Sequence, residues 1–157
     1  MADARRRPPE FSIDREARWH YRGTPIARVP LLHMLAAMLR RDARGHFLAT
    51  AEQRLGVEVA DAPFLANDLE VEGEGAARCL WLVTDLGARH AIGAQYPLRL
   101  RRDPVCDEWR LYQQLDAGLE ALVHRHVFYR LAELAEPEPG GERLGVFSGG
   151  AFFALEP

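Results

Sequence analysis

Hydrophobic residues recur at three- and four-residue steps in two segments of the chain, and this pattern predicts two helices. The longer segment has apolar positions that fall on one side of a helix: Leu119, Leu122, Val123, Val127, Leu131 and Leu134. Asp116 precedes this segment and can cap the N–H groups of its first turn. The shorter segment runs from about Pro30 to Arg40, and its proline is tolerated at the first helical position.

Elsewhere, apolar and polar residues alternate at period two, which is typical of β-strands. The predicted strands cover residues 11–14, 17–22, 46–50, 54–59, 64–72, 78–84, 88–94, 97–101, 108–114, 143–148 and 151–155. The polar stretch 136–142, which is rich in proline and glycine, predicts a flexible loop. Gly149-Gly150 predicts either a tight hairpin or a single bulged strand.

These elements predict an α+β fold made of two similar halves, each with mainly antiparallel strands and one main helix. The polar break at residues 72–75 is the predicted boundary. Residues 11–73 would then form the N-terminal half and residues 74–157 the C-terminal half, after a mobile tail over residues 1–10.

A rough internal repeat supports two similar halves. Trp19 and Trp109 each stand on a predicted strand shortly before a predicted helix, and each helix is followed by a short apolar strand. Duplication of a strand–helix–strand unit is the leading explanation, and chance similarity is the alternative.

Composition excludes several classes of function. With 48% hydrophobic and 27% charged residues among 157, the chain is typical of a soluble globular protein. All 20 basic residues are arginine, so Schiff-base chemistry, pyridoxal-phosphate attachment and a P-loop lysine are excluded. A net charge of -3 gives no overall attraction to nucleic acid or to an anionic membrane. Without a signal peptide or a long apolar run, the predicted location is cytoplasmic.

Candidate catalytic groups are few. Cys106 has no evident base partner, and Ser148 lacks the glycine two places earlier that a nucleophile elbow needs, because that place is Val146. His124 and His126 lie within the longer predicted helix, about 200° apart, so they should point to different sides. We therefore predict no catalytic residue, no metal site and no cofactor, and the sequence favours a protein that is not an enzyme.

Four stretches, read together, resemble one bacterial family. They are residues 19–26 (WHYRGTPI), 59–64 (VADAPF), 118–122 with 127–129 (GLEAL and VFY) and 148–153 (SGGAFF). The family that they resemble is called domain of unknown function 1285. The chain departs from its pattern at His126, where proline is usual, and at Asp116-Ala117, where Arg-Gly is usual.

The resemblance implies a duplicated α+β architecture whose C-terminal half looks superficially like a pleckstrin-homology barrel, capped by the longer helix. It also implies a site for a nucleotide-like molecule at the interface of the halves and a role in signalling. It implies no catalytic activity.

Two candidate ligand sites have simpler structural explanations. Asp61 could accept a hydrogen bond from a ligand hydroxyl and Phe64 could stack on a ring, but the stretch 61–64 is more typical of a structural turn. Gly149 and Gly150 could expose N–H groups to an anion, although a hairpin turn is the simpler explanation of the same residues. Both alternatives stay open at this point.

The leading hypothesis is a non-enzymatic protein with a regulatory role, which binds a small phosphorylated or nucleotide-like ligand in a cleft between its two halves. The predicted contacts are stacking by Tyr21 or Phe64, hydrogen bonds from Thr24, Asp61 and Ser148, and phosphate contacts from Arg28 or from Gly149 and Gly150. The alternative is a protein-interaction adaptor module that binds a partner protein and no small ligand. Neither hypothesis includes a nucleic-acid or membrane partner.

Overall fold

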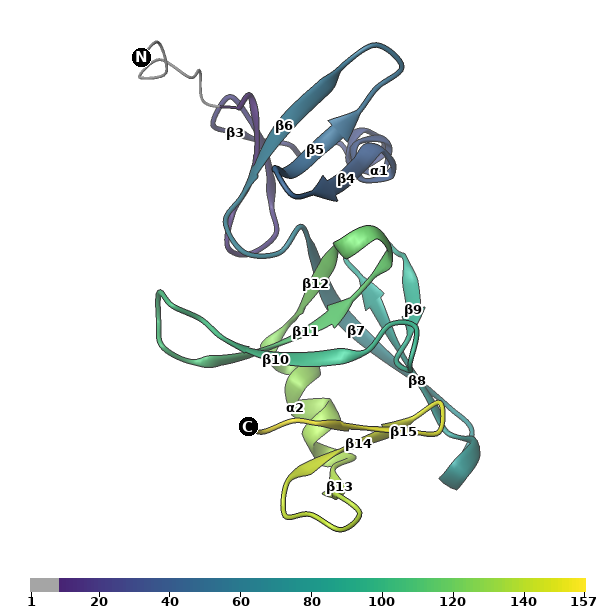
Figure 1. Cartoon of the computed structure of the whole chain (residues 1–157). Helices are drawn as coiled ribbons and strands as arrows, with labels where there is room; N and C mark the ends of the chain where they lie inside the picture. Colours follow the sequence, from purple (N-terminus) through teal and green to yellow (C-terminus); the bar gives the residue numbers. More distant parts are fainter. Residues whose placement is uncertain (1–8) are drawn as a thin grey trace. The chain divides into compact units, whose positions relative to one another are not determined.

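The computed structural model describes residues 9–157 (Figure 1). The chain divides into two compact units, Met1–Ala62 and Pro63–Pro157, called unit 1 and unit 2 below. Unit 1 contains β1 (Phe11–Ile13), β2 (Trp19–Tyr21), β3 (Thr24–Pro25), α1 (Val29–Met38), β4 (Leu39–Asp42), β5 (Gly45–Ala49) and β6 (Arg54–Val59).

The six strands of unit 1 form one sheet in the order β3-β2-β1-β6-β5-β4. Strands β1 to β3 and strands β4 to β6 each form an antiparallel group of three neighbours in sequence. The two groups are joined by a parallel pairing of the first strand with the sixth, in which Phe11 lies opposite Val57. The core of the unit is built from side chains at most 6% exposed: Ile13, Ala17, Trp19, Leu35, Leu39, Leu48 and Val57.

Unit 2 has a larger set of elements. They are β7 (Phe64–Glu72), η2 (Gly75–Ala77), β8 (Cys79–Thr84), β9 (Arg89–Ala91), β10 (Leu98–Arg102), β11 (Trp109–Gln114), η3 (Asp116–Gly118), β12 (Glu120–Val123), α2 (Arg125–Glu133), β13 (Glu136–Pro137), β14 (Leu144–Ser148) and β15 (Ala151–Ala154). Its main sheet has the order β10-β11-β12-β7-β8-β9, and β13-β14-β15 form a small third sheet.

The main sheet of unit 2 repeats the strand plan of unit 1. Two antiparallel groups of three strands are again joined by a parallel pairing of the first strand with the sixth, with Ala121 of β12 opposite Phe64 of β7. The α+β fold with two similar halves, predicted from the sequence, is therefore confirmed.

The helix occupies a different place in the two plans. Along the chain, helix α1 comes after the first three strands of unit 1 and before the last three. Helix α2 comes after all six strands of the main sheet of unit 2. Trp19 stands on the second strand of its unit and Trp109 on the fifth, so the two residues are not equivalent and the proposed strand–helix–strand repeat is wrong in detail.

The predicted helix over residues 119–134 is wrong for its first part and correct for its second part. Glu120–Val123 form strand β12, which lies inside the sheet between β11 and β7 and is buried at all four positions. Only Arg125–Glu133 are helical, with Val127 and Leu131 completely buried. A strand that is covered on both faces has apolar residues at consecutive positions, and these continued the helical pattern.

Further differences concern three short strands and the shape of the main sheet of unit 2. Strands β3, β4 and β13 were not predicted, and β13 falls in the segment expected to be a flexible loop. The main sheet of unit 2 is open, with β10 and β9 as its end strands, so it is not a closed barrel. The other predicted strands are present with small shifts at their ends.

The division between the units falls after Ala62, earlier than the predicted boundary at residues 73 and 74. The polar stretch there is the turn between β7 and β8, which pair over most of their length. Gly73 has a φ of +72°, and a Cβ at this position would lie 2.6 Å from the backbone oxygen of Ala77. The glycine therefore serves a tight turn inside unit 2.

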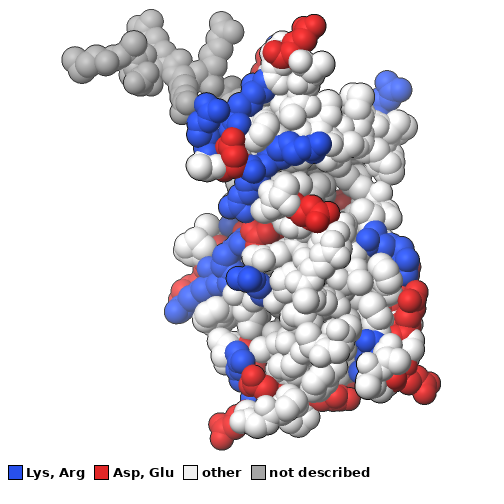
Figure 2. Space-filling model, turned by 45° about the vertical axis from the view of Figure 1, so that its right-hand side comes forward, with Lys and Arg blue, Asp and Glu red and all other residues white. Residues whose placement is uncertain are grey.

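The surface is mixed in charge. Acidic and basic side chains are interspersed over the face shown in Figure 2, and many form ion pairs, such as Arg89 with Glu70 and Arg143 with Glu138. Over residues 9–157, no helix has both the length and the apolar character needed to cross a membrane.

Candidate functional site

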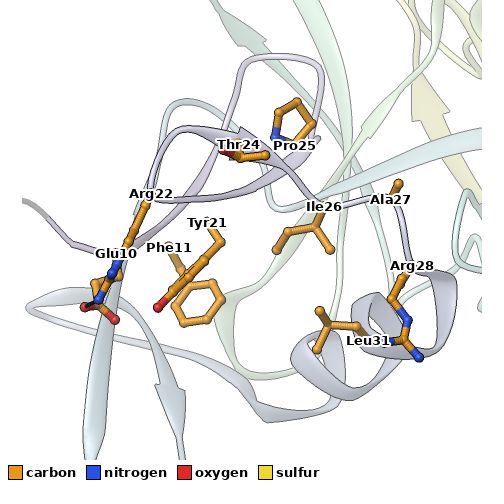
Figure 3. Close-up of a pocket in the computed structure, with 10 residues that line it drawn as sticks. All are labelled: Glu10, Phe11, Tyr21, Arg22, Thr24, Pro25, Ile26, Ala27, Arg28 and Leu31. Carbon is orange, nitrogen blue, oxygen red and sulfur yellow. Dashed lines mark hydrogen bonds and ion pairs between the residues drawn. The ribbon is translucent and has the colours of Figure 1, made fainter.

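A pocket of about 740 Å³, open to solvent, lies in unit 1 (Figure 3). It is formed by the β2–β3 hairpin, the start of β1 and the first turn of α1. Its lining residues are Glu10, Phe11, Tyr21, Arg22, Thr24, Pro25, Ile26, Ala27, Arg28 and Leu31. The pocket is therefore built from two stretches of sequence, 10–11 and 21–31.

Aromatic and aliphatic side chains form the middle of the pocket. Phe11 and Tyr21 lie opposite each other on the antiparallel strands β1 and β2, and their ring centroids are 5.0 Å apart. Ile26 and Leu31 lie beside these rings in Figure 3. An apolar surface next to an aromatic ring that is 39% exposed, as Tyr21 is, suits the face of a flat ligand.

The β2–β3 hairpin holds Tyr21 and Thr24 on either side of a two-residue turn. Arg22 and Gly23 occupy this turn with φ values of 48° and 82°, and Tyr21 pairs with Thr24 across it. Positive φ at both central residues is the geometry that matches the twist of antiparallel strands. The local sequence therefore fixes which residues face the pocket.

The two arginines of the pocket differ in their partners. Arg22 donates a hydrogen bond of 2.9 Å to Glu10, and this bond raises the pKa of Arg22 above its ordinary value. Within residues 9–157, Arg28 forms no such pair. The two lie at opposite ends of the pocket in Figure 3, so the positive charge that is available to an anion is that of Arg28.

The N-terminus of α1 adds to this positive end. Arg28 is the N-cap residue, its side chain makes no capping bond, and the first turn contains no acidic residue. The backbone N–H of Leu32 donates to the oxygen of Arg28. Ahead of it, the N–H groups of Val29 and Leu31 have no partner inside the helix, and Pro30 has no N–H. Helix dipole and guanidinium thus favour an anion at the same end of the pocket.

Three of the predicted ligand-binding residues lie in this pocket: Tyr21, Thr24 and Arg28. Asp61 belongs to unit 1 but not to the pocket lining. Sequence reasoning missed Phe11, Ile26 and Leu31, which supply the apolar surface. The period-two alternation that placed Phe11 and Tyr21 on neighbouring strands was the signal that could have found the ring pair.

The remaining predicted residues lie in unit 2 and are used by its own structure. Phe64 packs against the core of unit 2. Ser148 is fully buried and both donates and accepts a hydrogen bond. Gly149 and Gly150 form the two-residue turn of a tight hairpin with φ of 59° and 79°, and the N–H of Gly149 donates to the oxygen of Arg78 at 3.1 Å. A ligand role for these four residues stays a prediction.

The structure also shows where the other candidate catalytic and metal-binding residues lie. The thiol of Cys106 lies 3.0 Å from Oδ2 of Asp103, and this hydrogen bond raises the pKa of the thiol, which disfavours the reactive thiolate. His124 and His126 do not point apart as predicted, because His124 lies outside the helix as its N-cap, and their ring centroids are 4.3 Å apart. Residues 9–157 contain no group of three or more side chains suited to hold a metal ion.

Fold and pocket together define a class of protein: two α+β units that share a strand plan, the first with an open pocket that is apolar in the middle and cationic at one end. The chain belongs to the DUF1285 family. Residues 6–62 match the domain of unknown function (DUF1285), N-terminal domain, and residues 63–155 match the protein of unknown function (DUF1285), C-terminal domain. The boundary between the two matches coincides with that between the units.

Two crystal structures of family members are similar to this chain. A DUF1285 family protein from Silicibacter pomeroyi DSS-3 is 38% identical with a TM-score of 0.86, covering 94% of this chain and 79% of that chain. A DUF1285 family protein from Shewanella baltica OS155 is 25% identical with a TM-score of 0.64, covering 80% of this chain and 91% of that chain. A comparison with curated proteins gives no match.

Proposed function

We propose that this protein binds a small phosphorylated or nucleotide-like ligand in the pocket of unit 1, and that it serves a regulatory and not a catalytic role. The observation that carries the proposal is the position of Arg28, a cation without a carboxylate partner within residues 9–157, at one end of a pocket with an apolar middle. Ligands with a flat ring and an anionic group have the matching chemistry.

In this proposal, different pocket residues contact different parts of the ligand. Tyr21 and Phe11 offer ring faces to the flat part of the ligand, and Thr24 offers a hydroxyl. Arg28 can bind phosphate oxygens through two parallel N–H groups, and the N-terminus of α1 supports the same charge. Glu10, the one carboxylate that lines the pocket, is already bonded to Arg22, which favours binding over acid–base catalysis.

A panel of nucleotides and phosphorylated metabolites, tested by the change in melting temperature, checks the proposal. A ligand at one hundred times its Kd should add about 2.7 kcal/mol to the free energy of unfolding. Arg28→Ala should weaken binding about tenfold or more, because hydrogen bonds to a charged group contribute about 1.5–3 kcal/mol. Arg44→Ala is the matched control, since Arg44 is an exposed arginine of unit 1 outside the pocket.

The proposal fails if no member of the panel raises the melting temperature. It also fails if a ligand that does so binds Arg28→Ala as tightly as it binds the unchanged protein.

A second candidate is a protein-interaction adaptor without a small ligand. One observation favours it: Val29 and Met34, on the outer side of α1, are 55% and 53% exposed.

A further inference from the structure

The outer side of α1 is apolar, although it faces solvent. Its exposed residues are Val29, Pro30, His33, Met34 and Ala37, and their spacing places them on one side of the helix. These five residues are called the α1 docking face below. The solvent-facing side of a helix is normally polar or charged, and an apolar surface that stays exposed is typical of a protein interaction site.

Both ends of the α1 docking face are cationic. Arg28 is the N-cap residue at one end. At the other end, Nη1 of Arg40 donates to the backbone oxygens of Ala37 and Leu39 at 2.9 and 2.8 Å, which fixes the guanidinium beside the last turn. Neither arginine has a carboxylate partner within residues 9–157.

The stretch of sequence that contains the helix is rich in arginine and holds no acidic residue before Asp42, which is paired with Arg54. Of its arginines, Arg22 is paired with Glu10. Residues 17–41 contain five arginines and no aspartate or glutamate, in a chain with 23 acidic and 20 basic residues. Some exposed arginines elsewhere are neutralised by acidic side chains, as in the pairs of Arg54 with Asp42, Arg89 with Glu70 and Arg143 with Glu138. The α1 docking face therefore combines an exposed apolar surface with two arginines, in a stretch of sequence that contains no acidic residue.

We propose that the α1 docking face binds an acidic amphipathic helix of a partner protein. From Val29 to Ala37 the face is about 12 Å long, or roughly two helical turns, which suits apolar residues at intervals of three and four on the partner. Acidic side chains before and after these residues would meet Arg28 and Arg40. The inference rests on the adaptor candidate and not on the small-ligand pocket.

Charge argues against a second copy of this chain as the occupant. An antiparallel pair of α1 helices would bring Arg28 of one copy to Arg40 of the other, and parallel pairing would bring identical arginines together. Like charges juxtaposed in an interface are unfavourable.

A lipid surface is also a poorer match than a protein helix. Helices that lie on membranes have bulky aromatic or leucine residues on their apolar face. The α1 docking face has proline, histidine and alanine, and small residues such as Ala37 allow another helix to approach closely.

Selection from a library of random peptides of about 16 residues, displayed on phage and presented to the full chain, tests the proposal. We expect the enriched peptides to be acidic, with apolar residues at intervals of three and four. In fluorescence anisotropy, Met34→Glu should weaken binding of a synthetic enriched peptide about tenfold or more. Arg28→Glu and Arg40→Glu should also weaken it, and an otherwise identical peptide with lysine in place of its acidic residues should restore binding to the double variant.

Val105→Glu is the control, because Val105 is an apolar residue of unit 2 that is 73% exposed, and this change should leave binding unaltered. Met34 does not line the pocket, so the effect of Met34→Glu is independent of the small ligand. Circular dichroism spectra identical to that of the unchanged protein show that the exposed substitution has not disturbed folding.

Four results would overturn the proposal. They are the enrichment of peptides without acidic residues, equal binding by Met34→Glu, self-association of the chain that Met34→Glu abolishes, and binding to phosphatidylglycerol vesicles without any enriched peptide. The third result would assign the face to a second copy, and the fourth to a lipid surface.

Discussion

The hydroxyl of Ser148 donates a hydrogen bond of 2.6 Å to the backbone oxygen of Ile92. Oγ of Ser148 also accepts a hydrogen bond of 2.8 Å from the N–H of Leu80, and Ser148 is completely buried. Because Ser148 belongs to β14 while Leu80 belongs to β8, one side chain ties the small third sheet to the main sheet of unit 2.

Replacing Ser148 with alanine should lower the free energy of unfolding of unit 2 by about 1–3 kcal/mol, because two buried backbone groups would lose their partner. Urea denaturation measures the loss, and hydrogen exchange of residues 79–84 locates it. Ser12→Ala is the control, since Ser12 has no side-chain hydrogen bond within residues 9–157. Unchanged exchange at Leu80 in the Ser148 variant would contradict this account.

Ala117 has a φ of 58° in η3, a left-handed conformation that costs a residue with a Cβ roughly 1–2 kcal/mol. Glycine is usual here in the pattern that the chain resembles. Ala117→Gly should raise the free energy of unfolding of unit 2 by about 0.5–1 kcal/mol, after allowance for the greater freedom of glycine in the unfolded chain. The same change at Ala94, where φ is negative, should lower stability in thermal or urea denaturation. Destabilisation by both changes would refute the strain at Ala117.

The N-cap of α2 should make the stability of unit 2 depend on pH. Nδ1 of His124 accepts a hydrogen bond of 3.2 Å from the N–H of His126, and burial, together with the neighbouring His126 and Arg125, lowers the pKa of His124. The unfolded chain therefore takes up its proton first as the pH falls below about 6.5. This contribution to stability is present above that pH and is lost as the pH falls through the lower pKa of the folded state.

His124→Asn supplies a cap that does not titrate, so the loss of stability between about pH 7.5 and 5.5 should be smaller in this variant. Some dependence should remain, because burial also lowers the pKa of His90. Urea denaturation at both pH values makes the comparison. An equal loss in variant and unchanged protein would show that the cap is not responsible.

The carboxyl of Asp42 should titrate far below an ordinary aspartate. Hydrogen bonds from Arg54, and then from the N–H of Arg44, lower the pKa of Asp42 to about 2. Arg54→Gln should raise this pKa towards that of an unperturbed aspartate, as followed by NMR of the carboxyl carbon. Arg143→Gln removes an arginine from unit 2 and is the control. A pKa near 3.8 in the unchanged protein would contradict the pairing.

The alternation of apolar and polar residues predicted most strands correctly, because most strands have one face against the core and the other face towards solvent. In β8, buried and partly exposed residues alternate without a break from Cys79 to Thr84, which is the pattern that period-two reasoning detects. Strand β12 is covered on both faces and carries no alternation. Its place in the sheet depends on β7, which lies far away in sequence, so the neighbouring residues could not distinguish it from the helix that follows.

The proximity of the pocket residues was predictable because they are close in sequence, whereas contacts between distant residues were not. Tyr21, Thr24 and Arg28 lie within eight residues of one another, on a hairpin and its connection to α1, so their proximity follows from short-range geometry. Ser148 serves the fold through partners at residues 80 and 92. Contacts over such separations leave no local sequence pattern, so this structural role of Ser148 could not be predicted from the neighbouring residues.

In each unit the first strand pairs with the last of the six, and this order has a consequence for synthesis on the ribosome. Hairpins between neighbouring strands form in about 1–10 μs, whereas pairing of distant segments waits for the entropy of closing the intervening chain. The pairing of Ile13 with Val59 requires that all of the intervening strands have emerged from the exit tunnel. Unit 1 can then complete its sheet while the strands of unit 2 are still being translated. The nascent protein would therefore form the pocket of unit 1 before unit 2 folds.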